Sequence, residues 1–445
     1  MEFFFVCSKN EYIFAFVLKK KLVKLIELTM KKAVIFLFGI VLFIFALSSC
    51  GKRENGQLTG VQDRPAWKGI NPYGMVYIPS GFMHMGQDDN DMFHSYTKRS
   101  KAVSINGFYM DDTEITNNEY RQFVYYVRDS IARTMADYTY QDDDGNDRID
   151  WEEDIDWEDE MLDEMYFQGD MMINGKKELD TRQLVFQYQW IDWQKAADVN
   201  WKNTDMTRSD LIHKEKVNIY PDTLVWIRDF AYAYNEPFSR NYFWHPAYDD
   251  YPVVGVNWNM AKAFNYWRTK YWNDYSGAEV NTEEFRLPYE AEWEWAARGG
   301  HERAAYPWGS YYVRNAKGCP LANFKPGRGN YGEDGGMFTV KANAYFPNEY
   351  GLYNMAGNVS EWTETAYYPY GYQIEHDLNP NVTYNANEED ALAMKRKVIR
   401  GGSWKDVYYY LQTSSRDFEF QDTTKSYIGF RSALTFLGRS INDFN

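Results

Sequence analysis

The chain has 445 residues, 18% of them aromatic, and its formal net charge at pH 7 is −16. This length suffices for two or three average domains or for one large irregular domain. The acidic balance excludes nucleic acid as a main partner, because there is no basic surplus to neutralise phosphates.

The first predicted element is a targeting segment. From Met30 a pair of lysines precedes an apolar run over 33–47, which is shorter than the roughly 20 residues of a membrane-spanning helix and is typical of a signal peptide. The run ends in LSSC, which resembles the cleavage box of bacterial lipoproteins. We therefore expect lipidation at Cys50. An uncleaved anchor helix is the alternative, and a second apolar stretch over 12–18 leaves a two-span hairpin open.

These signals divide the front of the chain. Residues 1–49 are interpreted as leader and signal peptide, with translation starting at Met30, and residues 50–72 as lipid anchor and tether. The tether begins GKRENGQ and lacks the acidic cluster of surface-exported lipoproteins, so we expect the outer membrane, periplasmic face. Cys319 is then the single cysteine of the mature fold and is expected to be a small packed residue.

Residues 73–445 are predicted to form the folded domain. MVYIPSGFMHMG over 75–86 predicts a strand interrupted by a Pro-Ser-Gly turn. Thr116 and Glu119 form a capping box, which predicts the start of a helix. Its apolar residues recur at helical spacing, namely Tyr120, Phe123, Val124 and Val127.

An acidic and aromatic region at about 128–245 is interpreted as an insertion. Its negative run over 142–164 is typical of a solvated face. The alternative is a calcium loop, in which positions 1, 3, 5, 9 and 12 would be Asp142, Asp144, Asn146, Asp150 and Glu153. Asp147 stands where such a loop requires glycine.

Two further helices are predicted after the insertion. Asn257 caps the first, whose apolar stripe is Ala261, Phe264, Trp267 and Tyr271. The second lies within 286–300, with Pro288 in its first turn and Gly299 at its end. Its core-facing residues are expected to be Trp293, Ala296 and Ala297.

Four segments occur in an order that resembles the formylglycine-generating-enzyme, or sulfatase-modifying-factor, family. They are RLPYEAEWEWAARGG (286–300), YGLYNMAGNVSEW (350–362), RGGSW (400–404) and GFR (429–431). The resemblance covers about 75–127 and 246–436. It implies an irregular α+β fold related to C-type lectins, here carrying a large insertion.

The resemblance also says where catalysis would occur. Members with enzymatic activity bind copper through two cysteines, because soft thiolates select Cu(I). The matching positions here are Asp406 and Leu411. A related branch holds iron with histidines, but the six histidines of this chain are scattered. We therefore expect neither copper nor iron and no enzymatic activity. An oxidase with other metal ligands is the remote alternative.

Structural calcium is also implied by the resemblance. The first site would use Asn323, Phe324, Asp334 and Gly336, and the second Asn354, Gly357, Val359 and Glu361. Side-chain and main-chain oxygens are the ligands that calcium prefers. The alternative is that Asn354 and Glu361 only cap turns.

A lipoprotein signal, this domain and the replaced cysteines together resemble the GldK/PorK group of gliding-motility and type IX secretion lipoproteins, with GldJ as a close alternative. That resemblance implies a periplasmic ring built with a GldN/PorN-like partner, which serves export of proteins carrying a C-terminal signal. The candidate contact surface comprises Trp190, Trp193, Trp201, Trp226 and Trp244. These residues could instead fill the core of the insertion. The alternative function is binding of glycan or peptidoglycan.

Overall fold

The residues that the computed structural model describes all lie within the unit Trp67–Asn445. The described residues are 71–87, 100–142, 145, 147–198, 206–232, 237–276, 281–327 and 330–438. No helix in these ranges is long and apolar enough to cross a membrane. Cys50 and Trp201 lie outside the described residues, as do the leader and the tether up to residue 70.

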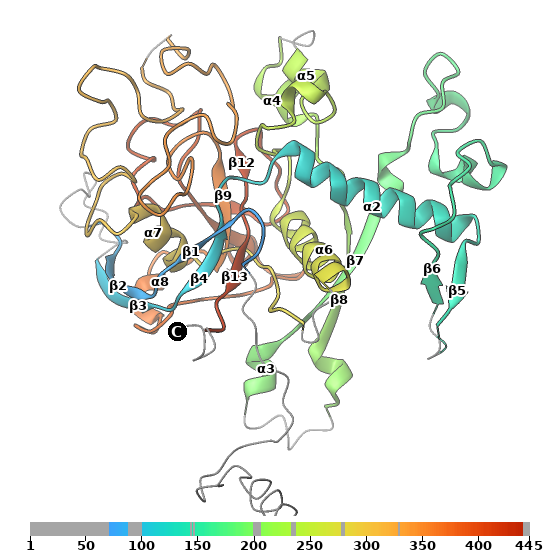
Figure 1. The fold of residues 1–445 in the computed structure, drawn as a ribbon, viewed down its shortest axis with the longest axis horizontal. Helices are drawn as coiled ribbons and strands as arrows, with labels where there is room; N and C mark the ends of the chain where they lie inside the picture. The colour runs from blue at the N-terminus through green and yellow to red at the C-terminus, as the bar shows by residue number, and fades with distance from the viewer. Residues whose placement is uncertain are drawn as a thin grey trace, which may run out of the picture. The chain divides into compact units, whose positions relative to one another are not determined.

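The domain opens with two small antiparallel sheets (Figure 1). Strands β1 (Met75–Ile78), β4 (Phe108–Asp111) and β13 (Ala433–Thr435) form the first, in the order β1-β4-β13. Strands β2 (Gly81–Met85) and β3 (Lys101–Ile105) form the second. The predicted Pro-Ser turn separates β1 from β2, so this prediction is confirmed.

A four-stranded sheet brings together three of the segments that resemble the family, namely 350–362, 400–404 and 429–431. Its order is β11 (Asp417–Phe420), β10 (Arg396–Arg400), β9 (Ser360–Ala366) and β12 (Ile428–Gly429). Glu361 on β9 lies opposite Arg400 on one side and Gly429 on the other. Segments that are far apart in the sequence thus meet at one residue.

Three longer helices pack around these sheets. They are α2 (Asn117–Met135), α6 (Trp258–Ser276) and α7 (Glu290–Arg298). The capping box of α2 is confirmed, since the Thr116 amide donates to Glu119 Oε2 at 2.8 Å and the Glu119 amide donates to Thr116 Oγ1 at 3.3 Å. Asn257 Oδ1 caps α6 by accepting from the Met260 amide at 2.9 Å.

One predicted helix boundary was wrong. Pro288 lies outside α7, because Tyr289 is the N-cap residue and the helix begins at Glu290. The capping hydrogen bond comes from within the first turn of the helix, where Glu292 Oε2 accepts from the Tyr289 amide at 3.0 Å. The predicted end is correct, with Gly299 in the left-handed conformation at φ 57°.

The region 128–245 starts inside α2, which continues to Met135. It contains the hairpin β5 (Thr139–Gln141) and β6 (Asp147–Ile149) and the longer hairpin β7 (Val185–Ile191) and β8 (Ile212–Asn218). The short α-helices of the described residues are α3 (Trp193–Ala197), α4 (Val225–Asp229), α5 (Pro237–Asn241) and α8 (Gly371–Ile374). Single 3-10 turns occur at Glu160–Met165, Gly169–Met171, Thr181–Gln183, Arg208–Leu211, Pro246–Tyr248 and Leu392–Lys395.

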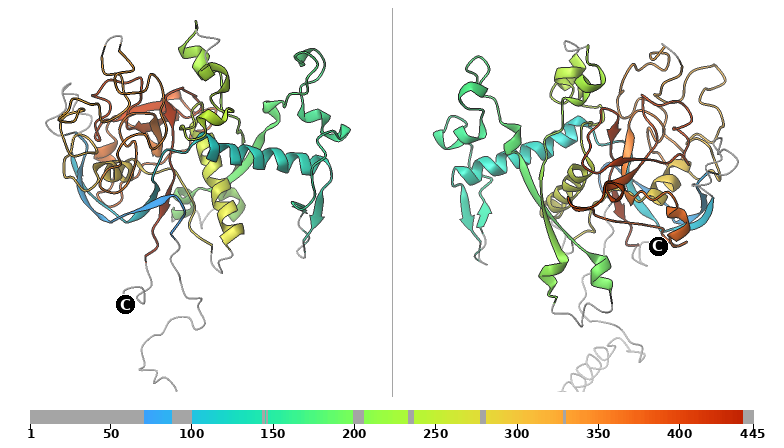
Figure 2. Two further views of the ribbon diagram at one scale, coloured as in Figure 1. Left: turned by 45° about the horizontal axis from the view of Figure 1, so that its top comes forward. Right: turned by 180° about the vertical axis from the view of Figure 1, so that it is seen from behind.

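The longer hairpin shares the main hydrophobic core. Tyr188 of β7 is buried in the same cluster as Phe123 of α2, Phe264 of α6 and Trp362 of β9. The right-hand view of Figure 2 shows β7 and β8 lying against α6. A second cluster lies under α7 and includes the predicted core residues Trp293, Ala296 and Ala297. The predicted irregular α+β fold, with short strands and much loop, is therefore confirmed.

Candidate functional site

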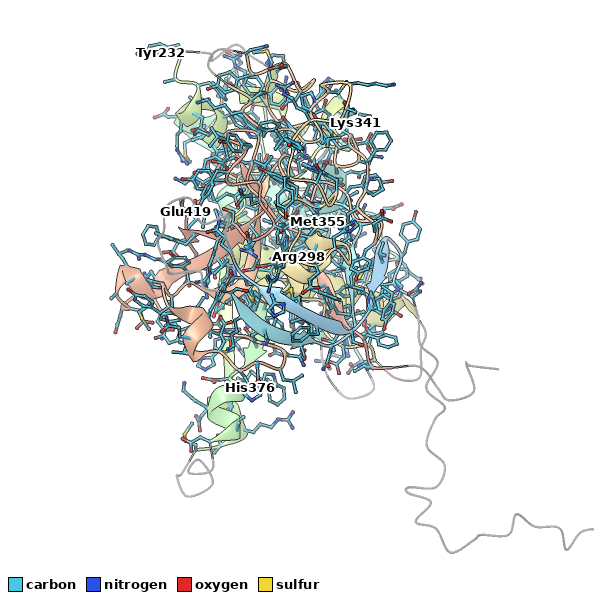
Figure 3. All side chains as sticks on the ribbon, turned by 90° about the vertical axis from the view of Figure 1, so that its left-hand side faces the viewer. Tyr232, Arg298, Lys341, Met355, His376 and Glu419 are labelled. Atoms are coloured by element: carbon cyan, nitrogen blue, oxygen red, sulfur yellow. The ribbon has the colours of Figure 1, made fainter. Side chains whose placement is uncertain are left out.

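A buried charge network lies where α7 meets β10. Glu294 of α7 is fully buried and accepts from Arg298 Nη2 at 2.6 Å and from Arg400 Nη2. Burial alone would raise the pKa of Glu294, but the two guanidinium groups hold this pKa below its usual value. Arg400 also donates to the carbonyls of Ser415 and Thr413 at 2.7 and 2.9 Å. Arg298 and Met355 can be found within the body of the fold in Figure 3.

A second buried ion pair joins β9 to the segment after β12. Arg431 Nη2 donates to Glu361 Oε1 at 2.6 Å, and Arg431 Nε donates to Glu361 Oε2 at 2.7 Å. Trp293 Nε1 also donates to Oε2 at 2.7 Å. Both carboxylate oxygens of Glu361 are therefore occupied by strong donors.

The positions that match the copper cysteines serve structural contacts. Asp406 Oδ2 accepts from Ser403 Oγ at 2.6 Å and from the Ser403 amide at 3.0 Å, and burial raises the pKa of Asp406. Leu411 is fully buried and packs in a cluster with Tyr306 and Phe324. Neither side chain supplies a thiolate. Among the described residues, no three His, Cys, Asp or Glu side chains are grouped so that they could hold a metal ion.

The first candidate calcium site is brought together by the fold. Asp334 Oδ2 accepts from the Phe324 amide at 2.7 Å, and Oδ1 accepts from the Gly336 amide at 3.1 Å. Asn323 is 1% exposed, and its Oδ1 is buried without a hydrogen-bond partner. A Cβ at Gly336 would lie 3.3 Å from this oxygen and 2.4 Å from Val340 Cγ1. An unpaired amide oxygen is a ligand type that calcium prefers, so Asn323, with Asp334 joined to the neighbouring Phe324 and to Gly336, could hold calcium.

The second candidate calcium site fits less well. Asn354 donates through Nδ2 to the Ala342 carbonyl at 2.8 Å and to Glu114 Oε2 at 3.1 Å. Glu361 already pairs with Arg431, whose positive charge would repel a cation. The arrangement favours a structural ion pair at this position.

Sequence reasoning missed two residues that connect the candidate sites. Glu114 is fully buried; its Oε1 accepts from Asn358 Nδ2 at 3.0 Å, and its pKa is raised to about 8 by burial. Asn358 Oδ1 accepts from Asn323 Nδ2 at 3.3 Å. Asn354 and Asn358 both adopt left-handed backbone, at φ 49° and 62°. Asparagine tolerates left-handed backbone better than most residues, so the residue type at 358 was a sequence signal for a turn. No comparable signal in the sequence marks Glu114.

The predicted tryptophan surface divides into different environments. Trp226 is 2% exposed and stacks with Phe230 and Trp404, so its assignment to a contact surface was wrong and the core alternative holds there. Trp190 is half-buried, and its Nε1 donates to Glu215 Oε1 at 2.7 Å. The exposed members are Trp193 at 70% and Trp244 at 39%.

Two other sequence predictions meet the structure. Cys319 is exposed, and the prediction that it packs in the core was wrong. In the proposed calcium loop, Asp144 and Asn146 lie outside the described residues. The flanking residues close the β5–β6 hairpin, and Asp142 pairs with Arg148 at 2.9 Å. Calcium at this loop stays a prediction.

Comparisons with known proteins agree with the four segments. The family described as sulfatase-modifying factor enzyme 1-like domain matches residues 64–436. The formylglycine-generating enzyme of Mus musculus is 27% identical over 369 residues, covering 82% of this chain and 75% of that protein. The inactive C-alpha-formylglycine-generating enzyme 2 of Bos taurus is 33% identical over 190 residues, covering 41% of this chain and 50% of that protein.

Among solved structures, PvdO from Pseudomonas aeruginosa matches with a TM-score of 0.44 and 16% identity, covering 81% of this chain and 94% of that chain. The relatives thus include proteins named as enzymes and proteins named as inactive. On the extent of the family match, the chain belongs to the sulfatase-modifying factor, or formylglycine-generating enzyme, family.

Proposed function

We propose that this chain is a non-catalytic member of its family that acts as a structural lipoprotein of the GldK/PorK type. In this proposal Cys50 carries the lipid, the domain lies on the periplasmic face of the outer membrane, and it forms a ring with a GldN/PorN-type partner. The ring serves export of proteins with a C-terminal signal. The carrying observation is the replacement of both copper cysteines by Asp406 and Leu411.

The contacts of those two residues support the loss of catalysis. Leu411 is fully buried among apolar side chains, and the Asp406 carboxylate is engaged by Ser403. A Cu(I) site needs two thiolates that face each other, and neither residue type can replace them. A stoichiometric amount of copper or iron in the purified protein would overturn this part of the proposal.

Assembly into a ring requires two different contact surfaces on each subunit. Exposed aromatic side chains are enriched in protein interfaces, and this chain has many. The most exposed tyrosines and tryptophans of the described part are Tyr73, Trp193, Tyr232, Tyr275, Tyr311 and Tyr312. Tyr232 is labelled at the periphery of the fold in Figure 3. These residues support the proposal without assigning any of them to a partner.

The experiment is coexpression of the full chain with a GldN/PorN-type partner, followed by membrane fractionation and electron microscopy of the detergent-extracted protein. We expect a ring of high mass in the membrane fraction. Cys50→Ala should release the chain from the membrane, whereas retention would point to an uncleaved anchor. A chain that stays monomeric with the partner present would refute the scaffold role.

A further inference from the structure

A cleft lies between the β7–β8 hairpin, α6 and the loop 381–387. Its volume is about 840 Å³, which is within the usual range of sites for small ligands. The hairpin belongs to the region 128–245, whereas α6 and the loop belong to the part of the chain that resembles the family. The cleft is also separate from the candidate calcium residues, none of which lines it.

Asn265 of α6 is the clearest sign that the cleft receives a ligand. Its side chain lines the cleft and is 2% exposed, and neither its Oδ1 nor its Nδ2 has a hydrogen-bond partner among the residues that the structure describes. A buried amide with both ends unpaired costs on the order of 1–3 kcal/mol for each group. Both groups are buried, so a ligand in the cleft meets them only when the Asn265 side chain or its neighbours in the lining move.

Aromatic rings line the same cleft. Trp193 is 70% exposed there, and Trp190 stacks on His213 with ring centroids 4.4 Å apart. Tyr266 is on α6, next to Asn265 in sequence, and also lines the cleft. Rings with one accessible face can stack against the C–H face of a sugar ring, while neighbouring polar groups bind its hydroxyls.

The charges of the cleft are largely paired within the protein. Lys262 Nζ lies 3.2 Å from Glu364 Oε1, and Lys195 Nζ lies 3.1 Å from Asp192 Oδ2. Between them the lining is rich in neutral amides and hydroxyls, including those of Gln189, Thr269, Asn381, Asn385 and Asn387. Such a lining favours an uncharged polar ligand over an ion.

We propose that this cleft is a binding site for a neutral saccharide. Each ring hydroxyl can donate and accept, so two adjacent hydroxyls could satisfy both ends of the Asn265 amide once that side chain turns toward the cleft. Trp193, which is exposed, supplies the apolar platform that a sugar ring covers. The saccharide site is independent of the scaffold function, because a subunit of a ring could carry this cleft and so could a protein that forms no ring.

The test titrates cellotetraose and chitotetraose into the full-length protein in detergent, using calorimetry and tryptophan fluorescence. The first sugar lacks acetamido groups and the second carries them, so the pair distinguishes plain glycans from N-acetylated wall-type glycans. A neutral tetrapeptide serves as the third probe. The variants are Asn265→Leu and Trp193→Ala, with Trp244→Ala as matched control, because Trp244 is an exposed tryptophan outside the cleft.

We expect at least one sugar to bind, and each cleft variant to weaken that binding by about tenfold or more, which is the loss of about 1.4 kcal/mol. Trp244→Ala should bind as the parent does. Asn265→Leu should keep or raise the melting temperature, since it removes an unpaired buried amide. A merely structural Asn265 would instead lower it.

Three results would overturn the proposal. The first is that neither sugar binds the parent protein. The second is that the cleft variants bind the sugar as tightly as the parent does. The third is that the tetrapeptide binds while both sugars fail to bind. The last result would make the cleft a peptide site.

Discussion

The two candidate calcium sites can be separated by paired substitutions at Glu361 and Asp334. Glu361→Gln keeps the shape of the side chain but removes the counter-charge of Arg431, with both groups fully buried. Removing one partner of a buried ion pair typically costs about 3–5 kcal/mol. Arg431 retains its bonds to the Asp111 carbonyl at 3.1 Å and the Tyr353 carbonyl at 2.9 Å, which places the expected cost near the lower end.

That cost corresponds to a drop in melting temperature on the order of 5–10 °C, because about 2–4 °C follows each kcal/mol in domains of 150–250 residues and less in larger ones. The drop should be the same with calcium and with chelator, since the ion pair needs no metal. An exposed carboxylate offers the matched control: Glu302→Gln, whose side chain is 71% exposed, should change the free energy of unfolding by less than about 0.5 kcal/mol.

Asp334→Asn should behave differently. The amide can still accept through one oxygen but loses the charge that attracts a cation, so the parent should gain stability with calcium and the variant should not. When free calcium is at one hundred times the dissociation constant of the site, binding raises the free energy of unfolding by about 2.7 kcal/mol. Melting curves of parent and variants with excess calcium and with chelator test this. Equal melting of the parent in both conditions would refute the first site, and loss of calcium dependence in Glu361→Gln would refute the assignment of Glu361 to Arg431 alone.

Three further predictions concern single side chains. Lys397 is fully buried, and burial lowers its pKa to about 7, so the unfolded chain binds more protons than the folded chain between pH 7 and about 10.5. This residue therefore makes the free energy of unfolding rise with pH in that range. In denaturant titrations, Lys397→Met should be more stable than the parent by on the order of 1–3 kcal/mol below pH 7, and this difference should shrink towards pH 10. Asp406→Ala should lose about 1–2 kcal/mol, because two hydrogen bonds from Ser403 disappear, yet leave secretion intact; a secretion defect in a folded variant would mean that the position still has a role. Trp226→Ala should cost about 3–5 kcal/mol and Trp244→Ala under about 1 kcal/mol in thermal unfolding, and equal losses would contradict the different burial of the two residues.

The sequence predicted the features that depend on neighbouring residues. The capping box at Thr116, the cap at Asn257 and the helix end at Gly299 each rest on contacts within a few residues, and all three are confirmed. Their signals are local because a helix terminus exposes unpaired amides and carbonyls that nearby side chains satisfy. The start of α7 was misplaced because Pro288 is compatible with a first turn as well as with the residue before the cap.

What the sequence could not supply are the contacts between distant segments. Glu294 and Arg400 are 106 residues apart, and Glu114 and Asn358 are 244 apart. The burial of Trp226 likewise depends on Phe338 and Trp404, which come from later loops. A tryptophan in an aromatic-rich segment has the same local pattern whether it faces solvent or core, so pattern alone could not distinguish Trp226 from Trp193.

The buried pairs give the family segments a structural role in this chain. Arg400 of RGGSW, Arg431 of GFR and Glu361 of NVSEW are each fully buried, and each lies against a residue of another segment. An unpaired charge in such a core would cost several kcal/mol, so losing any member destabilises the fold whatever its chemistry. Asp406 and Leu411 stand outside these pairs. We infer that these segments hold the fold, and that Asp406 and Leu411 stand at their positions without breaking a buried pair.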